Sequence, residues 1–135
     1  MITLHLAATC YMSGLIWVIQ MVHYPMLART GECFDDCQRF HLSRMTFIVA
    51  PVMLLELACA IWLAWRYPDE PVWWAGLALL AVIWISTFIL QVPRHDKLAR
   101  DGFSQTMHAG LVNSNWIRTA AWTLRAILFV YISAK

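Results

Sequence analysis

Long stretches of this chain carry no charge, and this absence limits its possible folds more than any motif does. No Asp, Glu, Lys or Arg occurs from Met1 to Ala28 or between Glu70 and Arg94. A membrane-spanning helix needs about 20 mainly apolar residues, and runs of about 18 or more with few charges are candidates. The helices of a soluble bundle would each need a polar face, which these runs lack. The sequence therefore predicts an all-α integral membrane protein.

Two further apolar runs carry one charge each, and the composition agrees with a membrane protein. Glu56 is the one charged residue of 45–65, and Arg125 is the one charged residue of 119–134. The chain is 61% hydrophobic and 13% charged, whereas a soluble domain usually carries about 25% charged residues. We expect a single domain, 1–135, forming a four-transmembrane-helix bundle in the lipid bilayer. The expected helices cover about 2–23, 45–65, 72–92 and 117–133.

The placement of Lys and Arg predicts the orientation. One side of the expected bundle holds two long loops with seven of the ten Lys and Arg residues, and the other side holds Arg66 and Lys135. The seven are Arg29, Arg39, Arg44, Arg94, Lys97, Arg100 and Arg118. Because basic loops stay in the cytoplasm, we expect the long loops there and both termini outside, in a multi-pass protein of the bacterial inner (plasma) membrane. No glycine-rich phosphate loop or other sign of nucleic-acid recognition occurs.

Two ten-residue stretches are similar where an apolar run ends. The first, Gln20–Arg29, reads QMVHYPMLAR, and the second, Gln91–Arg100, reads QVPRHDKLAR. Each carries a Gln, then a His and a Pro, and then Leu-Ala-Arg beginning seven residues after the Gln. The identities are few, so two duplicated helical hairpins and chance similarity both stay open.

Glu56 and Arg125 are expected near the centre of the bilayer. A charge there costs about 2.5–3.5 kcal/mol on insertion scales, so it normally faces the bundle and has a partner. The obvious partners are each other. One interpretation is a buried ion pair that fixes helix register. The alternatives are catalytic or binding roles: a proton relay, a metal-ligand carboxylate, or an anchor for a polar substrate head.

Four of the five histidines fall at the expected cytoplasmic interface, namely His23, His41, His95 and His108. Imidazole suits Zn, Cu and Fe, so this grouping predicts a site for a transition metal or haem, with His95 also a candidate for acid–base catalysis. No pair has the His-x-x-x-His or Glu-x-x-His spacing of a helical metal site, so four separate interfacial histidines are the alternative. His5, near the opposite face, is either a haem ligand or a helix-start residue.

Other polar residues follow helical spacing and would bind a substrate. The candidates are Gln20, Gln91, Asn115 and Arg118. In the first helix one face carries His5, Thr9, Ser13, Ile16, Gln20 and His23. In the last helix one face carries Asn115, Arg118, Trp122, Arg125 and Phe129, and His108 joins it if that helix begins early. Polar stripes in lipid should face other helices. The segment 34–44 could be a helical lead-in to the second apolar run, and 103–115 an interfacial helix with Phe103, Met107 and Leu111 on its apolar side.

Several short stretches also match a known pattern. They are Leu4-His5, Gly14-Leu15-Ile16-Trp17, His23-Tyr24-Pro25, Gln91-Val92-Pro93-Arg94-His95 and Asn115-Trp116-Ile117-Arg118-Thr119. With these motifs the chain resembles a group of small bacterial four-helix membrane proteins, remotely similar to the anthrone-oxygenase-like family. The family positions fall on Pro93, His95, Leu98, Arg118 and Thr119, with His95 where the anthrone-oxygenase pattern has Asn. The Leu-His start and the Gly-x-x-Trp region are similar to haem-binding membrane proteins of the copper-resistance-D type. The resemblance implies a redox function.

Three functional hypotheses follow. The leading one is a small membrane oxidoreductase, oxygenase-like, that acts on a hydrophobic small molecule in a pocket at the cytoplasmic interface. The second is a non-enzymatic carrier or binding protein for a metal ion or a lipophilic small molecule, which at this length would work as a homo-oligomer. The third is a partner subunit of a larger membrane complex.

Overall fold

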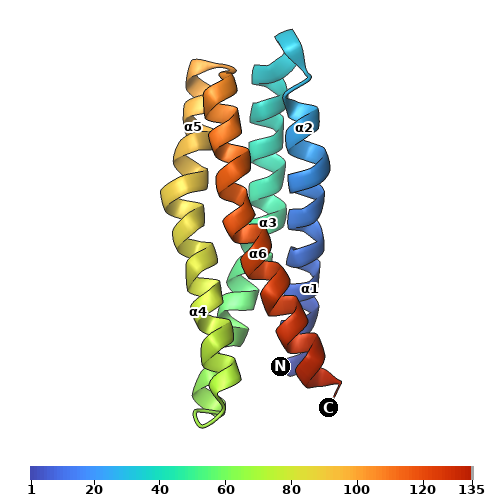
Figure 1. Cartoon of the computed structure of the whole chain (residues 1–135), viewed down its shortest axis with the longest axis vertical. Coiled ribbons are helices and arrows are strands. Elements are labelled where there is room, and N and C mark those ends of the chain that lie inside the picture. Colours follow the sequence, from blue (N-terminus) through green and yellow to red (C-terminus); the bar gives the residue numbers. More distant parts are fainter. Residues whose placement is uncertain (135) are drawn as a thin grey trace.

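The structure, a computed structural model, describes residues 1–134 as four long helical rods joined by short connections, with no β-strand in that range (Figure 1). The first rod contains α1 (Ile2–Val18), the π-helical turn η1 (Ile19–His23) and α2 (Tyr24–Leu27). The second contains the short 3-10 helix η2 (Gly31–Cys33) and α3 (Phe34–Arg66). The third contains α4 (Pro71–Ser86), the π-helical turn η3 (Thr87–Gln91) and α5 (Val92–Asp101). The fourth is α6 (Gln105–Ser133). The start of α1 and the end of α6 lie at the same end of the bundle as the α3–α4 turn.

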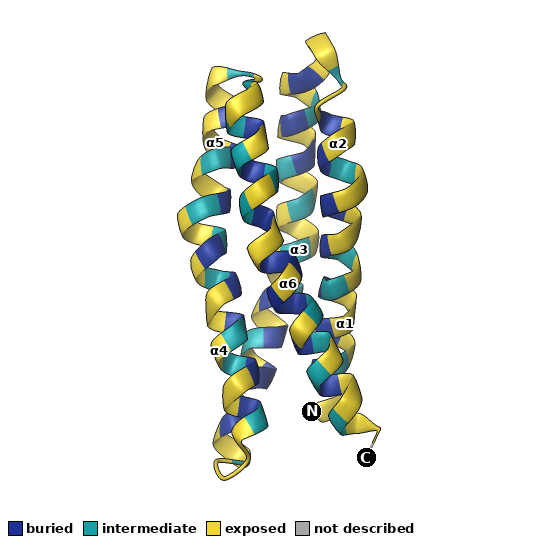
Figure 2. Cartoon of the chain, viewed as in Figure 1, coloured by how far each residue is buried: buried dark blue, intermediate teal, exposed yellow. Residues whose placement is uncertain are grey.

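Three of the rods are long and apolar enough to cross a membrane, judged by length and composition. They are Ile2–Leu27, Gly31–Arg66 and Pro71–Asp101. The outward surface of the bundle is rich in large apolar side chains, such as Phe47 at 81% exposure and Ile89 at 66% (Figure 2). Such a surface suits contact with a lipid bilayer. A fourth span in α6, and the orientation of the bundle, stay predictions.

The helices extend beyond the predicted spans at the end far from the termini. α3 begins at Phe34 rather than near 45, and α6 begins at Gln105 rather than near 117. Hydropathy identifies only the apolar part of a helix. The backbone hydrogen bonds of a helix can continue through polar residues, so the polar side chains before each apolar run did not end these helices. The helix expected at 103–115 forms from Gln105 onward, as the first part of α6, and its apolar residue Leu111 is fully buried in the bundle.

The two π-helical turns share one local cause. A proline follows each turn after one intervening residue: Pro25 follows η1, and Pro93 follows η3. Proline has no N–H, so the carbonyl four residues earlier, on Met21 or Ile89, loses its usual donor. At the end of each turn the N–H of the residue before the proline, on Tyr24 or Val92, bonds to a carbonyl five residues back, on Ile19 or Thr87. The similar stretches of sequence thus share a local structure, while their duplication stays a prediction.

Close packing joins α4 to α6 at a glycine. A Cβ atom on Gly76 would overlap the ring of Phe129, so only glycine fits at this approach. Phe129 also packs on Trp73, with ring centroids 5.5 Å apart. The approach places the Gly76 carbonyl within reach of the polar side chains of α6.

Candidate functional site

Two groups of buried polar side chains lie at different heights in the bundle. The ion-pair cluster comprises His5, Thr9, Glu56, Trp122 and Arg125. The relay cluster comprises Tyr24, Gln38, Gln91, His95 and Ser114. Each draws on several rods, so each depends on the whole bundle being assembled.

The ion-pair cluster is centred on Glu56 and Arg125, whose pairing the sequence predicted. Arg125 Nη2 lies 3.0 Å from Glu56 Oε1, and neither side chain has any exposed surface. The Thr9 hydroxyl donates to Glu56 Oε1 at 2.8 Å, and the Trp122 indole N–H donates to Glu56 Oε2 at 3.1 Å. The carboxylate therefore has three donors from two neighbouring rods.

Two further contacts of the Arg125 guanidinium complete the cluster. Nη1 donates to the carbonyl of Gly76, and Nη2 lies 3.1 Å from His5 Nε2. A guanidinium can only donate, so His5 Nε2 accepts and the ring carries its proton on Nδ1. His5 is therefore a member of this cluster and its Nε2 is not free to bind haem iron. The cluster connects α1, α3, α4 and α6 and fits the interpretation of a buried ion pair that fixes register.

The relay cluster runs across the bundle from α3 to α6. Gln38 Nε2 lies 2.9 Å from His95 Nδ1, and His95 Nε2 lies 3.2 Å from the Tyr24 hydroxyl. The Tyr24 hydroxyl lies 3.3 Å from Gln91 Oε1, and Gln91 Nε2 donates to Ser114 Oγ at 2.9 Å. All of these residues except Ser114 are buried.

The donor and the acceptor of each hydrogen bond in the relay cluster can be assigned. Gln38 donates to His95 Nδ1, so the His95 proton sits on Nε2 and points at the Tyr24 oxygen. Tyr24 then donates to Gln91 Oε1, whose amide N–H groups face Ser114 and the Leu111 carbonyl. Tyr24 and His95 thus form a polarised donor–acceptor pair of the kind used in proton transfer.

Other predicted site residues connect the helices beside the relay cluster. Asn115 Nδ2 donates to Gln20 Oε1 at 2.7 Å, and Gln20 Nε2 donates to the Val112 carbonyl at 3.3 Å. His108 Nε2 lies 3.1 Å from the Tyr24 carbonyl. Burial lowers the pKa of His108, and the hydrogen bond to that carbonyl opposes the shift. His108 lies on the buried face of α6, as predicted for a helix that begins early.

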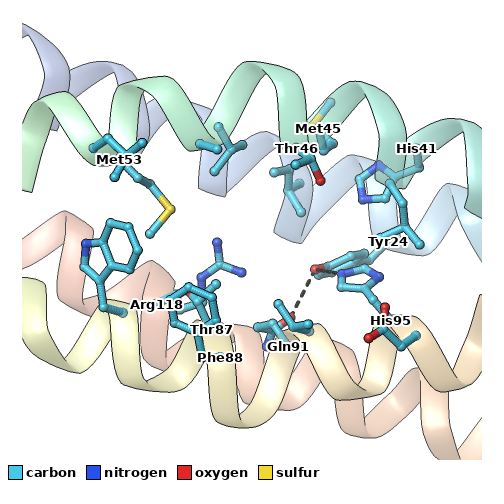
Figure 3. Close-up of a pocket in the computed structure, with 18 residues that line it drawn as sticks. Tyr24, His41, Met45, Thr46, Met53, Thr87, Phe88, Gln91, His95 and Arg118 are labelled. Carbon is cyan, nitrogen blue, oxygen red and sulfur yellow. Dashed lines mark hydrogen bonds between the residues drawn. The ribbon is translucent and has the colours of Figure 1, made fainter.

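A cavity of about 510 Å³ lies between α3 and the rod formed by α4, η3 and α5 (Figure 3). Its apolar wall includes Met45, Val49, Met53, Leu54, Trp84 and Phe88. Its polar wall is formed mainly by Tyr24, His41, Gln91, His95 and Arg118. Thr46, Ala50 and Phe88 line the cavity and are exposed, so the cavity opens on the outer surface of the bundle. A mostly apolar space with a few convergent polar groups is typical of a small-molecule site.

The structure divides the predicted site residues between these places. His41, Gln91, His95 and Arg118 line the cavity. Glu56 and Arg125 lie in the ion-pair cluster, and Gln20 and Asn115 bond to each other; these four do not line the cavity. Sequence reasoning missed Tyr24 and Gln38. Gln38 shares a helical face with Phe34 and His41, at spacings of 4 and 3, and that pattern was the available signal.

Three of the four predicted metal ligands lie together, but their ring nitrogens do not converge. The His23 and His41 rings stack with centroids 3.9 Å apart and an interplanar angle of 19°. Their in-plane lone pairs therefore lie in separate parallel planes, whereas a shared metal needs them aimed at one point about 2.0–2.1 Å away. Both His95 nitrogens have hydrogen-bond partners. Among residues 1–134 no group of three or more His, Cys, Asp and Glu is arranged to hold a metal ion. A metal or haem centre stays a prediction.

Comparisons with protein-family models, with curated proteins and with solved structures each gave no match.

Proposed function

We propose that this chain is a small membrane protein that binds a lipophilic small molecule in the cavity between α3 and η3. The observation that carries the proposal is the cavity itself, which is mostly apolar, opens on the outer surface of the bundle and has polar groups at one side. A ligand dissolved in the bilayer would enter sideways, past Ala50 and Phe88. Its apolar body would lie along the α3 wall, with its polar end toward Gln91 and Arg118.

Photolabelling in lipid tests this proposal. The chain is reconstituted into phosphatidylcholine nanodiscs with a long-chain alkyl diazirine, and adducts are mapped by mass spectrometry. We expect adducts on Met53, which lines the cavity and is only 4% exposed, with competition by unlabelled alkane. In Ala50→Trp the indole would fill the mouth of the cavity and remove these adducts.

The matched control is Ala58→Trp, which places the same side chain on an exposed position of α3 that does not line the cavity. It should leave the adducts unchanged. Labelling spread evenly over outward residues such as Phe47 and Ile89, and equal in both variants, would show general lipid contact and contradict the proposal.

A second candidate function is enzymatic, and the Tyr24–His95 pair favours it because both residues line the cavity. In this version the protein is an oxygenase-like oxidoreductase, as the family resemblance implies, and the pair moves a proton to or from the bound substrate. A test follows oxygen uptake with anthrone as the probe, which with one O₂ gives anthraquinone and water. Uptake that depends on the protein and is lost in Tyr24→Phe would support catalysis; uptake equal to the protein-free rate would refute it for this substrate class.

A further inference from the structure

Arg118 is a buried cation without an anion. Its side chain is 8% exposed and, within the described chain, it makes no hydrogen bond or ion pair. Its Nε atom is buried without a hydrogen-bond partner. The guanidinium carbon lies 5.2 Å from the centre of the Trp122 ring, a cation–π contact that leaves the N–H groups unused. Figure 3 shows the guanidinium directed into the space between the two helical walls.

The second buried arginine of the same helix, Arg125, is paired through its two Nη atoms, although its Nε likewise has no hydrogen-bond partner. Arg125 lies two turns further along α6, on the same face, and bonds to Glu56, to the Gly76 carbonyl and to His5. Arg118 has no such hydrogen-bond or ion-pair partner among the described residues. The acidic residue that lines the cavity is Asp96, and it is exposed. An unpaired charge away from water is costly, so the position of Arg118 calls for an anion from outside the chain.

Resting on the proposed function, we propose that the ligand is an amphiphilic anion, with an oxyanion head that pairs with Arg118 and an apolar body in the cavity. A guanidinium can bind a carboxylate or phosphate through two parallel N–H···O hydrogen bonds, in a bidentate geometry. Gln91 lies beside it in the cavity wall. The two sources of such a head in a membrane are a free long-chain carboxylic acid and an anionic phospholipid.

Matched probes separate charge from apolar contact. Binding of palmitate, methyl palmitate and phosphatidic acid to the full chain is measured by native mass spectrometry from phosphatidylcholine nanodiscs. Palmitate and its methyl ester share the apolar body and differ in charge. We expect palmitate to bind about 10- to 150-fold more tightly than the ester, the range that corresponds to a charge-assisted hydrogen bond.

Three variants identify the residue. Arg118→Met should bring palmitate down to the affinity of its ester, and Arg118→Lys should restore part of the difference. Arg29→Met removes an exposed arginine that does not line the cavity, and should change nothing. Because Arg118→Met removes an unpaired charge, the ligand-free variant should melt no lower than the wild type, so lost binding cannot be ascribed to unfolding.

The outcomes are distinct. A preference for palmitate over its ester that is lost in Arg118→Met supports the inference. Tighter binding of phosphatidic acid than of palmitate then assigns the anion to a lipid headgroup. Equal binding of palmitate and its ester in the wild type overturns the inference while the lipophilic site stands. Failure of every probe to bind overturns both.

Discussion

Replacing Arg125 with Met tests whether the ion-pair cluster holds the bundle together. The change removes the bonds that Arg125 donates to Glu56, Gly76 and His5, and it leaves the Glu56 carboxylate buried with only Thr9 and Trp122 as donors. Removing one partner of a buried pair costs about 3–5 kcal/mol. We therefore expect Arg125→Met to lower the free energy of unfolding by about that amount.

Replacing Glu56 with Gln lowers the stability of the bundle for a different reason. In Glu56→Gln the amide oxygen can still accept from Thr9, but the amide nitrogen then faces the Trp122 indole N–H, so two donors meet. The double variant, Glu56→Gln with Arg125→Met, leaves no charge in the ion-pair cluster. It should therefore lose less stability than the two single losses added together, with a coupling of about 2 kcal/mol or more.

Unfolding in mixed micelles, followed by tryptophan fluorescence and circular dichroism, measures all four corners of this cycle. The Arg39–Asp36 pair is a matched control, because its N–O distance is shorter, at 2.7 Å, but its side chains are 65% and 87% exposed. A cycle through Arg39→Gln and Asp36→Asn should show no measurable coupling, since water screens the pair. Additive losses in the Glu56–Arg125 cycle would refute the claim that the pair acts as a unit.

Three further predictions concern other parts of the bundle. Gly76→Ala should destabilise the protein by about 1–3 kcal/mol, because its methyl group would overlap Phe129, whereas Gly14→Ala, which has nothing within 4 Å, should not; equal melting temperatures would contradict this account of α4–α6 packing. Tyr24→Phe should cost about 1–3 kcal/mol by leaving His95 and Gln91 without the hydroxyl between them, and an unfolding midpoint equal to that of wild type would argue against the relay. The exposed Cys33 should react with a membrane-impermeant maleimide only after spheroplasts are permeabilised, and labelling of intact spheroplasts would reverse the predicted orientation.

The ion pair could be predicted from sequence because a charge in an apolar helix has few available partners. Glu56 and Arg125 are the single charges of their runs, so their pairing required only that both helices belong to one bundle. The buried face of α6 could also be predicted from the sequence. That helix runs without interruption from Gln105 to Ser133, so residues at helical spacing stay on one face along its whole length.

The position of the cavity, between α3 and the third rod, and the relay cluster could not be predicted, because they depend on a change of helical phase. A π-helical turn contains an extra residue, so side chains beyond it rotate away from the face that a 3.6-residue period assigns. The spacing from His5 through Gln20 placed His23 on the buried stripe. After η1, Tyr24 is 1% exposed and holds the buried position, whereas His23 is only half-buried. A helical lead-in over 34–44 was predicted, and α3 does begin at Phe34, but nothing in the sequence indicated that it would bring Gln38 to His95.

The ion-pair cluster also has a consequence for the order in which the chain can be made. Glu56 and Arg125 are 69 residues apart in sequence, so a ribosome releases the acidic helix well before the basic one. During that interval Thr9, on the first rod, is the one cluster donor to Glu56 already synthesised. A nascent or truncated chain that ends before α6 therefore holds a carboxylate among apolar helices without its Arg125 and Trp122 donors. The last helix to emerge completes the cluster, so the stable bundle exists only once synthesis has reached it.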